Sequence, residues 1–219
     1  MPSPRATLAR SWATSWKGTR WWCSAPAPWA CSRPSPPGAG RVIVIDHLEY
    51  RLEKARSFAQ AETFNFAEYD DIVVHLKKET DYLGADVVID AVGAEADGNF
   101  LQQVTATKLK LQGGSPVALN WAIDAVRKGG TVSVVGAYGP IFSAVKFGDA
   151  VNKGLSLRMN QCPVKRQWPR LFGHIQNGYL KPSDLVTHRI PLEHIAEGYH
   201  LFSAKLDNII KPLIISTTA

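Results

Sequence analysis

The sequence predicts an α/β protein built on a parallel sheet with helices on both of its faces. From residue 41 onward, short apolar runs alternate with helical patterns. The apolar runs contain almost no alternating polar positions, which is typical of strands buried on both faces. Strands of this kind separated by helices indicate a parallel sheet, because parallel neighbours require a crossover connection.

The elements follow one another in order along the chain. The predicted strands are Val42–Asp46, Thr63–Phe66, Asp86–Asp90, Thr131–Val135, Leu155–Met159, Leu185–Ile190 and Ile209–Ile215. The predicted helices are His47–Gln60, Asp70–Thr80, Leu119–Arg127, Trp168–Gln176 and Glu193–Phe202. The first helix has an apolar face, the second begins with acids that suit the helix dipole, and the third is expected to stop at Gly129-Gly130.

The first 40 residues have a different composition. They contain five of the seven tryptophans and seven of the fourteen prolines, with no Val or Ile. This stretch has neither the 3.6-residue hydrophobic period of a helix nor the 2-residue period of a strand, and its prolines interrupt any long element. We therefore expect residues 1–37 to be unstructured and residues 38–219 to form the folded part.

Charge and cysteine content exclude several classes of protein. The formal net charge is +6, but five of the 25 basic residues and none of the 19 acidic ones lie in the first 40 residues. The rest of the chain is nearly neutral, so we expect no nucleic-acid partner. No apolar run reaches 18 residues, so no membrane span is expected. The three cysteines suggest a reducing, cytoplasmic compartment.

The carboxyl ends of the predicted strands are where an open parallel sheet binds its ligand. Asp46 closes the first predicted strand, where an acid can accept hydrogen bonds from a ribose diol and repel a 2′-phosphate. An equally good interpretation makes Asp46 the N-cap of the following helix. Arg51 could reach back over an adenine face, or it could be a solvated helix residue.

Two small turns at later strand ends also point to a nucleotide. Asp90 leads into Ala91-Val92-Gly93, and Val135 leads into Gly136-Ala137. Glycine-containing turns let a flat ligand approach the backbone closely. Either turn alone could be ordinary turn chemistry, but two at successive strands favour a nucleotide cleft. The histidines and cysteines show no metal-ligand spacing, so no metal site is predicted.

Several motifs in order resemble the cofactor domain of zinc-dependent medium-chain dehydrogenases, in the alcohol or glutathione-independent formaldehyde dehydrogenase-like branch. They are Gly38–Asp46 with Arg51-Leu52, Gly84–Gly93, Gly129–Val132 and Asn160–Pro163. The resemblance covers residues 38–219 and implies a Rossmann-like fold, followed by the C-terminal tail of the dehydrogenase catalytic fold.

The resemblance also implies roles for individual residues. Asp46 would hold the adenosine ribose and select NAD. The backbone at Val135–Ala137 and the loop with Asn160 and Gln161 would lie near the nicotinamide. Lys211 would approach the cofactor pyrophosphate. Relatives act on small alcohols or aldehydes with a catalytic zinc, whose ligands come from an N-terminal domain that this sequence does not contain.

The glycine fingerprint of the first family strand is absent, but another reading frame supplies it. Tryptophan has one codon, so reading Thr19–Pro34 one base earlier forces valine at the Trp21/Trp22 and Trp22/Cys23 junctions and glycine at the Trp29/Ala30 junction. With G or C in most third codon positions, the shifted stretch becomes Asp-Thr-Val-Val-Val-Leu-Gly-Ala-Gly-Pro-Val-Gly-Leu-Phe-Ala-Ala. We therefore interpret residues 1–36 as an out-of-frame segment that leaves the first strand missing or garbled. An organelle transit peptide is the competing interpretation.

Three functions remain open at this point. The first is an NAD-dependent zinc-type oxidoreductase fragment, inactive alone and weak in cofactor binding because the fingerprint is lost. The second is a non-catalytic nucleotide-binding or dimerisation module that pairs through a sheet edge, near Leu155–Met159 or after Gly136. The third is the unfolded product of a faulty gene model.

Overall fold

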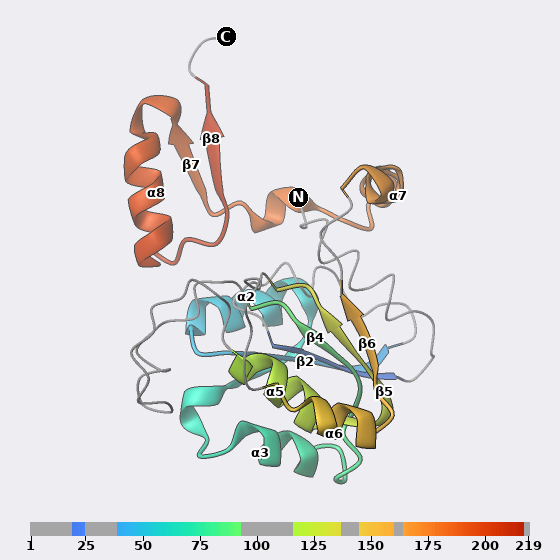
Figure 1. The fold of residues 1–219 in the computed structure, drawn as a ribbon. Helices are drawn as coiled ribbons and strands as arrows, with labels where there is room; N and C mark the ends of the chain where they lie inside the picture. Colours follow the sequence, from blue (N-terminus) through green and yellow to red (C-terminus); the bar gives the residue numbers. More distant parts are fainter. Residues whose placement is uncertain (1–18, 25–38, 93–115, 137–144, 160–163, 217–219) are drawn as a thin grey trace.

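A computed structural model shows the protein as a six-stranded parallel sheet followed by a smaller C-terminal unit (Figure 1). It describes residues 19–24, 39–92, 116–136, 145–159 and 164–216. The strands of the main sheet are β1 Thr19–Ser24, β2 Ala39–Asp46, β3 Glu62–Asn65, β4 Ala85–Asp90, β5 Val126–Val134 and β6 Ser156–Met159. Their order in the sheet is β3-β2-β1-β4-β5-β6, so the predicted parallel α/β class is confirmed.

Helices cover both faces of this sheet, as the uninterrupted apolar strands predict. The helices are α2 Glu49–Ala59, α3 Ile72–Lys78, α5 Pro116–Ala125 and α6 Phe147–Asn152, with a 3-10 turn η2 at Phe66–Glu68. Val44 of β2 packs in one apolar cluster with Leu52 of α2, whereas Ile43 and Ile45 pack in the other with α3 and α5. Alternate residues of one strand therefore serve two cores. Burying one large aliphatic side chain contributes about 1.5–3 kcal/mol.

Strand β1 corrects the expectation that the first strand is missing. It lies at the centre of the sheet and pairs in parallel with β2 on one side and β4 on the other. The prolines that were expected to prevent this, Pro26 and Pro28, follow the strand instead of interrupting it. Every residue from Thr19 to Ser24 therefore keeps its ladder N–H. The remaining residues of the expected unstructured segment lie outside the described ranges.

The end of helix α5 differs from the prediction. The helix stops at Ala125 and β5 begins at once, so Gly129-Gly130 lie inside the strand and Arg127 is not helical. Lys153 explains the early stop, because its Nζ donates to the carbonyls of Ile123 at 2.7 Å, Asp124 at 2.8 Å and Val126 at 3.1 Å. A side chain nearly 30 residues away thus satisfies carbonyls that a helix end leaves without partners.

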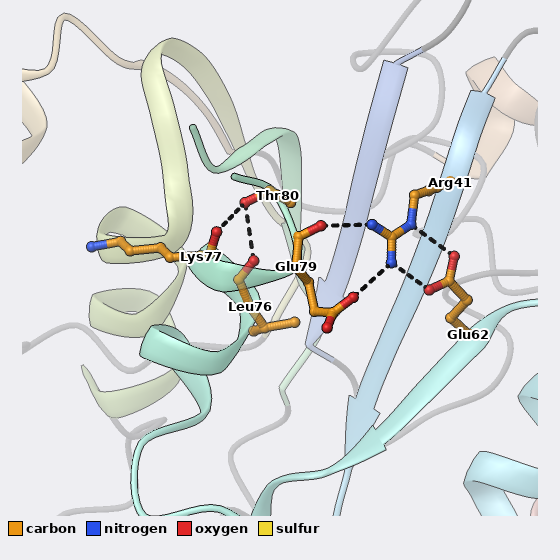
Figure 2. Close-up of polar contacts among 6 residues, drawn as sticks. All are labelled: Arg41, Glu62, Leu76, Lys77, Glu79 and Thr80. Carbon is orange, nitrogen blue, oxygen red and sulfur yellow. Dashed lines mark hydrogen bonds and ion pairs between the residues drawn. The ribbon is translucent and has the colours of Figure 1, made fainter. Parts of the chain in front are cut away.

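An ion-pair cluster joins the opposite, amino end of β2 to its neighbours (Figure 2). The Arg41 guanidinium donates to both carboxylate oxygens of Glu62, at 2.9 and 2.6 Å. It also donates to the Glu79 carbonyl at 2.7 Å. Next to it, Thr80 donates to the carbonyls of Leu76 and Lys77, both at 3.0 Å, and so closes the last turn of α3. This end of the sheet is tied together by side chains.

The C-terminal unit consists of helix α7, followed by a two-stranded parallel sheet with helix α8 packed beside it. Its elements are α7 Val164–Gln176, η3 Pro182–Leu185, β7 His188–Pro191, η4 Leu192–His194, α8 Ile195–Ala204 and β8 Pro212–Ile215. Both strands are shorter than predicted. Leu185 sits in a 3-10 turn, and Ile209 and Ile210 are buried in the turn before β8. In Figure 1 the β7–β8 pair and α8 stand apart from the six-stranded sheet.

Candidate cofactor-binding site

The strand order reverses direction at the centre of the sheet, next to β1. The chain winds from β1 outward through β2 and β3, then returns to the other side of β1 through β4 and β5. Ligands of open parallel sheets bind where the order reverses in this way, because the connections diverge and leave space between them. The reversal here lies between β1 and β4. Asp46 at the end of β2 and Asp90 at the end of β4 flank it.

Asp46 uses one carboxylate oxygen for the fold and leaves the other without a hydrogen bond. The residue is 3% exposed. Its Oδ1 accepts from the backbone N–H groups of His47 at 2.7 Å and Leu48 at 3.1 Å. Its Oδ2 is buried and has no hydrogen-bond partner among the described residues. The helix N-cap is Leu48, with no side-chain cap, so the interpretation of Asp46 as the N-cap of this helix is wrong.

Arg51 lies beside Asp46 and is not a solvated helix residue. Its side chain is only 12% exposed, and its Nη1 is 3.8 Å from Asp46 Oδ2. That distance is too long for a hydrogen bond, and Nη1 has no other hydrogen-bond partner among the described residues. The guanidinium carbon also lies 5.7 Å from the centre of the Tyr50 ring. An unused donor and an unused acceptor therefore face each other at the end of β2.

Burial and charge act in opposite directions on the Asp46 carboxyl. Burial raises its pKa above the ordinary value, because the carboxylate has lost water. The Arg51 guanidinium and the two backbone N–H groups lower the pKa in part. A ligand hydroxyl that donated to Oδ2 would favour the ionised form further. This geometry fits the ribose-binding role proposed from the sequence.

Asp90 has a different function at the end of β4. It is fully buried, and its Oδ1 accepts from the backbone N–H of Val92 at 3.0 Å. Its carbonyl accepts from the N–H groups of Val135 at 2.7 Å and Gly136 at 3.1 Å. Asp90 thus brings together the two turns that the sequence singled out, through backbone atoms. The Asp90 side chain holds the backbone of the turn in place and is not exposed to solvent.

The other predicted site residues are less well placed by the structure. Lys211 is exposed just before β8, and its described backbone contacts are with Thr187 of the C-terminal unit. Four predicted residues lie outside the described ranges: Gly93, Ala137, Asn160 and Gln161.

His47 and Phe66 are neighbours of the site that the sequence did not reveal as such. The His47 side chain is 38% exposed, with its Nδ1 3.4 Å from Asp46 Oδ1. Its ring lies 5.3 Å from that of Phe66, which in turn packs edge-on against Trp121 at 5.5 Å. Their positions in the sequence could have indicated this, because His47 directly follows Asp46 and Phe66 directly follows β3. Two strand ends therefore contribute aromatic rings next to the carboxylate.

Within the described ranges, no three His, Cys, Asp or Glu side chains are grouped closely enough to hold a metal ion. In the same part of the chain, no helix has the length and apolar character needed to cross a membrane.

Comparison with known sequences identifies the family. The zinc-binding dehydrogenase family matches residues 37–111. The zinc-type alcohol dehydrogenase-like protein AdhB of Bacillus subtilis (strain 168) is 38% identical over 177 residues, which is 81% of this chain and 46% of that protein. A probable zinc-binding alcohol dehydrogenase of Mycobacterium tuberculosis is 31% identical over 74% of this chain and 35% of its own length. The chain thus spans less than half the length of these two relatives.

Solved structures agree on the fold. The alcohol dehydrogenase TADH from Thermus sp. ATN1 superposes with a TM-score of 0.77 at 24% identity, over 99% of this chain and 56% of that one. A short chain alcohol dehydrogenase from E. coli CFT073, complexed with NADH, gives a TM-score of 0.75 at 18% identity, over 99% of this chain and 57% of that one. These structures show the fold, and the matching family and the sequence relatives show that the chain belongs to the zinc-type alcohol dehydrogenase family.

Proposed function

We propose that this chain is the nucleotide-binding half of an NAD-dependent alcohol or aldehyde dehydrogenase. The observation that carries the proposal is the buried, unpartnered Oδ2 of Asp46, which faces the equally unpartnered Nη1 of Arg51. A buried acceptor and donor without partners cost free energy, so such a pair indicates a missing ligand group. A ribose hydroxyl satisfies both, because it donates one hydrogen bond and accepts another.

The remaining strand ends would receive the rest of the cofactor. The Asp90 side chain binds the Val92 N–H, and the Asp90 carbonyl binds the N–H groups of Val135 and Gly136, so these three residues would line the site beyond the ribose. Bound NAD would supply the hydride acceptor, while these residues would hold and orient it. Gly93, Ala137, Asn160, Gln161 and Lys211 belong to the same proposal on the ground of the family resemblance.

Chemistry on the alcohol would require the part of the relatives that this chain does not span. The C-terminal unit supports this, because 11 of the 17 large hydrophobic residues that are exposed in the described part of the chain lie in residues 164–215. A two-stranded parallel sheet with exposed Leu213, Ile214 and Ile215 is poorly stable by itself. We propose that it completes a catalytic domain, whose zinc would polarise the substrate oxygen, in a protein of the cytoplasm.

Calorimetric titration with NAD tests the proposal. Weak binding is expected, because the sequence of residues 25–38 lacks the glycine fingerprint that receives a pyrophosphate. Asp46→Asn should weaken binding further, whereas the matched control Asp70→Asn, an exposed acid ahead of α3, should not. A micromolar constant would contradict the predicted weakness. Equal NAD affinity of the Asp46→Asn and Asp70→Asn variants would contradict the assignment of Asp46 to the binding site.

A dimerisation module is the second candidate, and the edge strand β6 favours it. Within the described sheet, β6 pairs only with β5, and Met159 is exposed. Phe147 and Val151 of the preceding helix α6 are exposed as well. Light scattering after size-exclusion chromatography tests this candidate, with a zinc assay in parallel. A zinc-free dimer that Met159→Lys converts to a monomer would support it, and a wild-type monomer would exclude it.

A further inference from the structure

Three ionisable side chains meet where β2 runs into α2. Asp46 is almost fully buried, with Arg51 Nη1 3.8 Å from its Oδ2 and His47 Nδ1 3.4 Å from its Oδ1. One acid is therefore flanked by a permanent cation and by an imidazole that can become one. The other acid near the start of α2, Glu49, is paired with Arg56. We call Asp46, His47 and Arg51 the β2–α2 corner, or simply the corner. Together with the Glu49–Arg56 pair, it carries no net negative charge.

This charge balance affects whether the corner binds adenosine with a free 2′-hydroxyl or adenosine with a 2′-phosphate. An acid at the end of this strand normally disfavours a 2′-phosphate because the two anions repel each other. Here the repelling charge is opposed by Arg51, whose unpartnered donor is of the type that binds phosphate oxygens best. One oxygen of Asp46 is also held by two backbone N–H groups, which offset part of its negative charge.

His47 supplies a second group, an imidazole with ring N–H donors, on the solvent side. Its side chain is 38% exposed, so it can reach a group larger than a hydroxyl. Phe66 packs against the imidazole, and Trp121 packs against Phe66, so the ring is held beside the carboxylate. We propose that this corner accepts 2′-phosphorylated adenosine as well as adenosine with a free 2′-hydroxyl, with His47 and Arg51 holding the phosphate.

The consequence is a site that takes NADP in addition to NAD. This inference rests on the proposed function, since it concerns the same nucleotide cleft. It assigns to His47 a part in cofactor specificity, and it moves Arg51 from the adenine face to the ribose. The Asp46 carboxylate remains the group that favours a free 2′-hydroxyl. The Arg51 cation and a hydrogen bond from the His47 ring offset its effect on a phosphate.

Two small probes test the corner without involving the pyrophosphate segment. Adenosine 5′-monophosphate and adenosine 2′,5′-bisphosphate both carry the adenosine end, and they differ only in the 2′-phosphate. Calorimetric titration of the full chain should show both probes binding, with the bisphosphate at least as tightly bound. The probes need nothing from residues 25–38, so a poor pyrophosphate site does not affect the comparison.

Variants then assign the phosphate contact to His47. His47→Ala should weaken bisphosphate binding about tenfold, the loss expected for one charge-assisted hydrogen bond, and change monophosphate binding less than about twofold. Lys54→Gln removes a cation from the same helix at a residue with no described contact to Asp46, and it should change neither probe. His47→Arg should tighten the bisphosphate alone, and such a gain cannot come from misfolding.

Each outcome separates this inference from the proposed function. If the monophosphate binds and the bisphosphate is at least about tenfold weaker, the inference is overturned and the proposed function stands. The same holds if His47→Ala leaves the bisphosphate unchanged or weakens both probes equally. If neither probe binds at millimolar concentration, the adenosine site itself is absent, and the proposed function and the inference are both overturned.

Discussion

Asp46 and Asp90 each end a buried apolar strand on either side of β1, yet they differ in how their oxygens are used. The Asp90 side chain accepts from Val92, and its carbonyl accepts from the end of β5. Asp46 has one oxygen in a turn and one with no partner among the described residues. Burial is nearly the same in both, so exposure alone does not separate them.

The comparison teaches that hydrogen-bond satisfaction, and not the residue type, separates a structural acid from a ligand-binding one. A buried acid whose acceptors are filled holds the backbone in place. A buried acid with an unfilled acceptor costs stability unless a ligand fills it. From the sequence both aspartates were predicted to bind the cofactor. In the structure, only Asp46 has an oxygen available to do so among the contacts described.

The largest effect is expected from restoring the glycine fingerprint in residues 19–30, the segment that contains β1. Replacing residues 19–30 with the residues of the shifted frame supplies the glycines that let a pyrophosphate meet a helix N-terminus. NAD affinity should rise by at least about tenfold, since several charge-assisted hydrogen bonds become possible. Calorimetric titration measures this change. An unchanged affinity would contradict the frame interpretation. Sequencing the transcript across codons 30–40 tests it independently.

Asp90→Ala should cause the largest loss of stability. The change leaves the Val92 N–H without its described acceptor beside a fully buried site, which costs about 1–3 kcal/mol of the free energy of unfolding. Urea denaturation measures the loss. Asp90→Asn is the matched control, because its amide oxygen can still accept from Val92. If both variants unfold at the wild-type urea concentration, Asp90 does not organise the turns.

Asp46→Asn should reverse this pattern, with a loss of affinity and no loss of stability. One weakened hydrogen bond to the ribose corresponds to about tenfold in the dissociation constant for adenosine 5′-monophosphate. The asparagine oxygen can still accept from His47 and Leu48, so the turn is kept. Titration and urea denaturation of the same sample measure both effects. A stability loss as large as that of Asp90→Ala would make the two aspartates equivalent.

The pH dependence of stability sharpens the contrast. Because burial raises the pKa of Asp46 in the folded state, ionising this carboxyl costs stability. Its contribution is complete below the unfolded value of 3.8 and is lost as the pH rises through the folded pKa. Asp46→Asn should therefore gain stability relative to wild type with rising pH, as measured by urea denaturation. A constant difference between pH 4 and pH 8 would contradict the raised pKa.

The smallest effect is expected at the opposite end of β2. Hydrogen bonds from Arg41 lower the pKa of Glu62, so this pair stabilises the fold above pH 4.5 and loses its contribution as the pH falls through the lowered value. The side chains are 34% and 45% exposed, which limits the contribution to at most about 1 kcal/mol. Arg41→Met should remove this acid dependence and leave nucleotide affinity unchanged. An altered affinity would mean that the two ends of β2 are coupled.

The parts of the fold that could be predicted rest on local patterns. The uninterrupted apolar runs of β2 and β4 predict strands buried on both faces, and the core clusters confirm it. Strand β1 was missed because Trp-rich composition and nearby prolines concealed it, and its two neighbours in the sheet stabilise it. The end of α5 was missed because Lys153, far along the chain, satisfies its carbonyls.

For the site, the sequence alone determined that acids and small turns stand at the carboxyl ends of parallel strands. The apolar runs and their alternation with helical patterns are enough for that, because both can be recognised in the order of residues alone. Only the tertiary structure decided which acid keeps an unfilled oxygen, and that Arg51 and His47 flank it. The reason is physical: whether a buried polar atom is satisfied depends on partners that the fold brings within hydrogen-bond distance, and local sequence does not specify that distance.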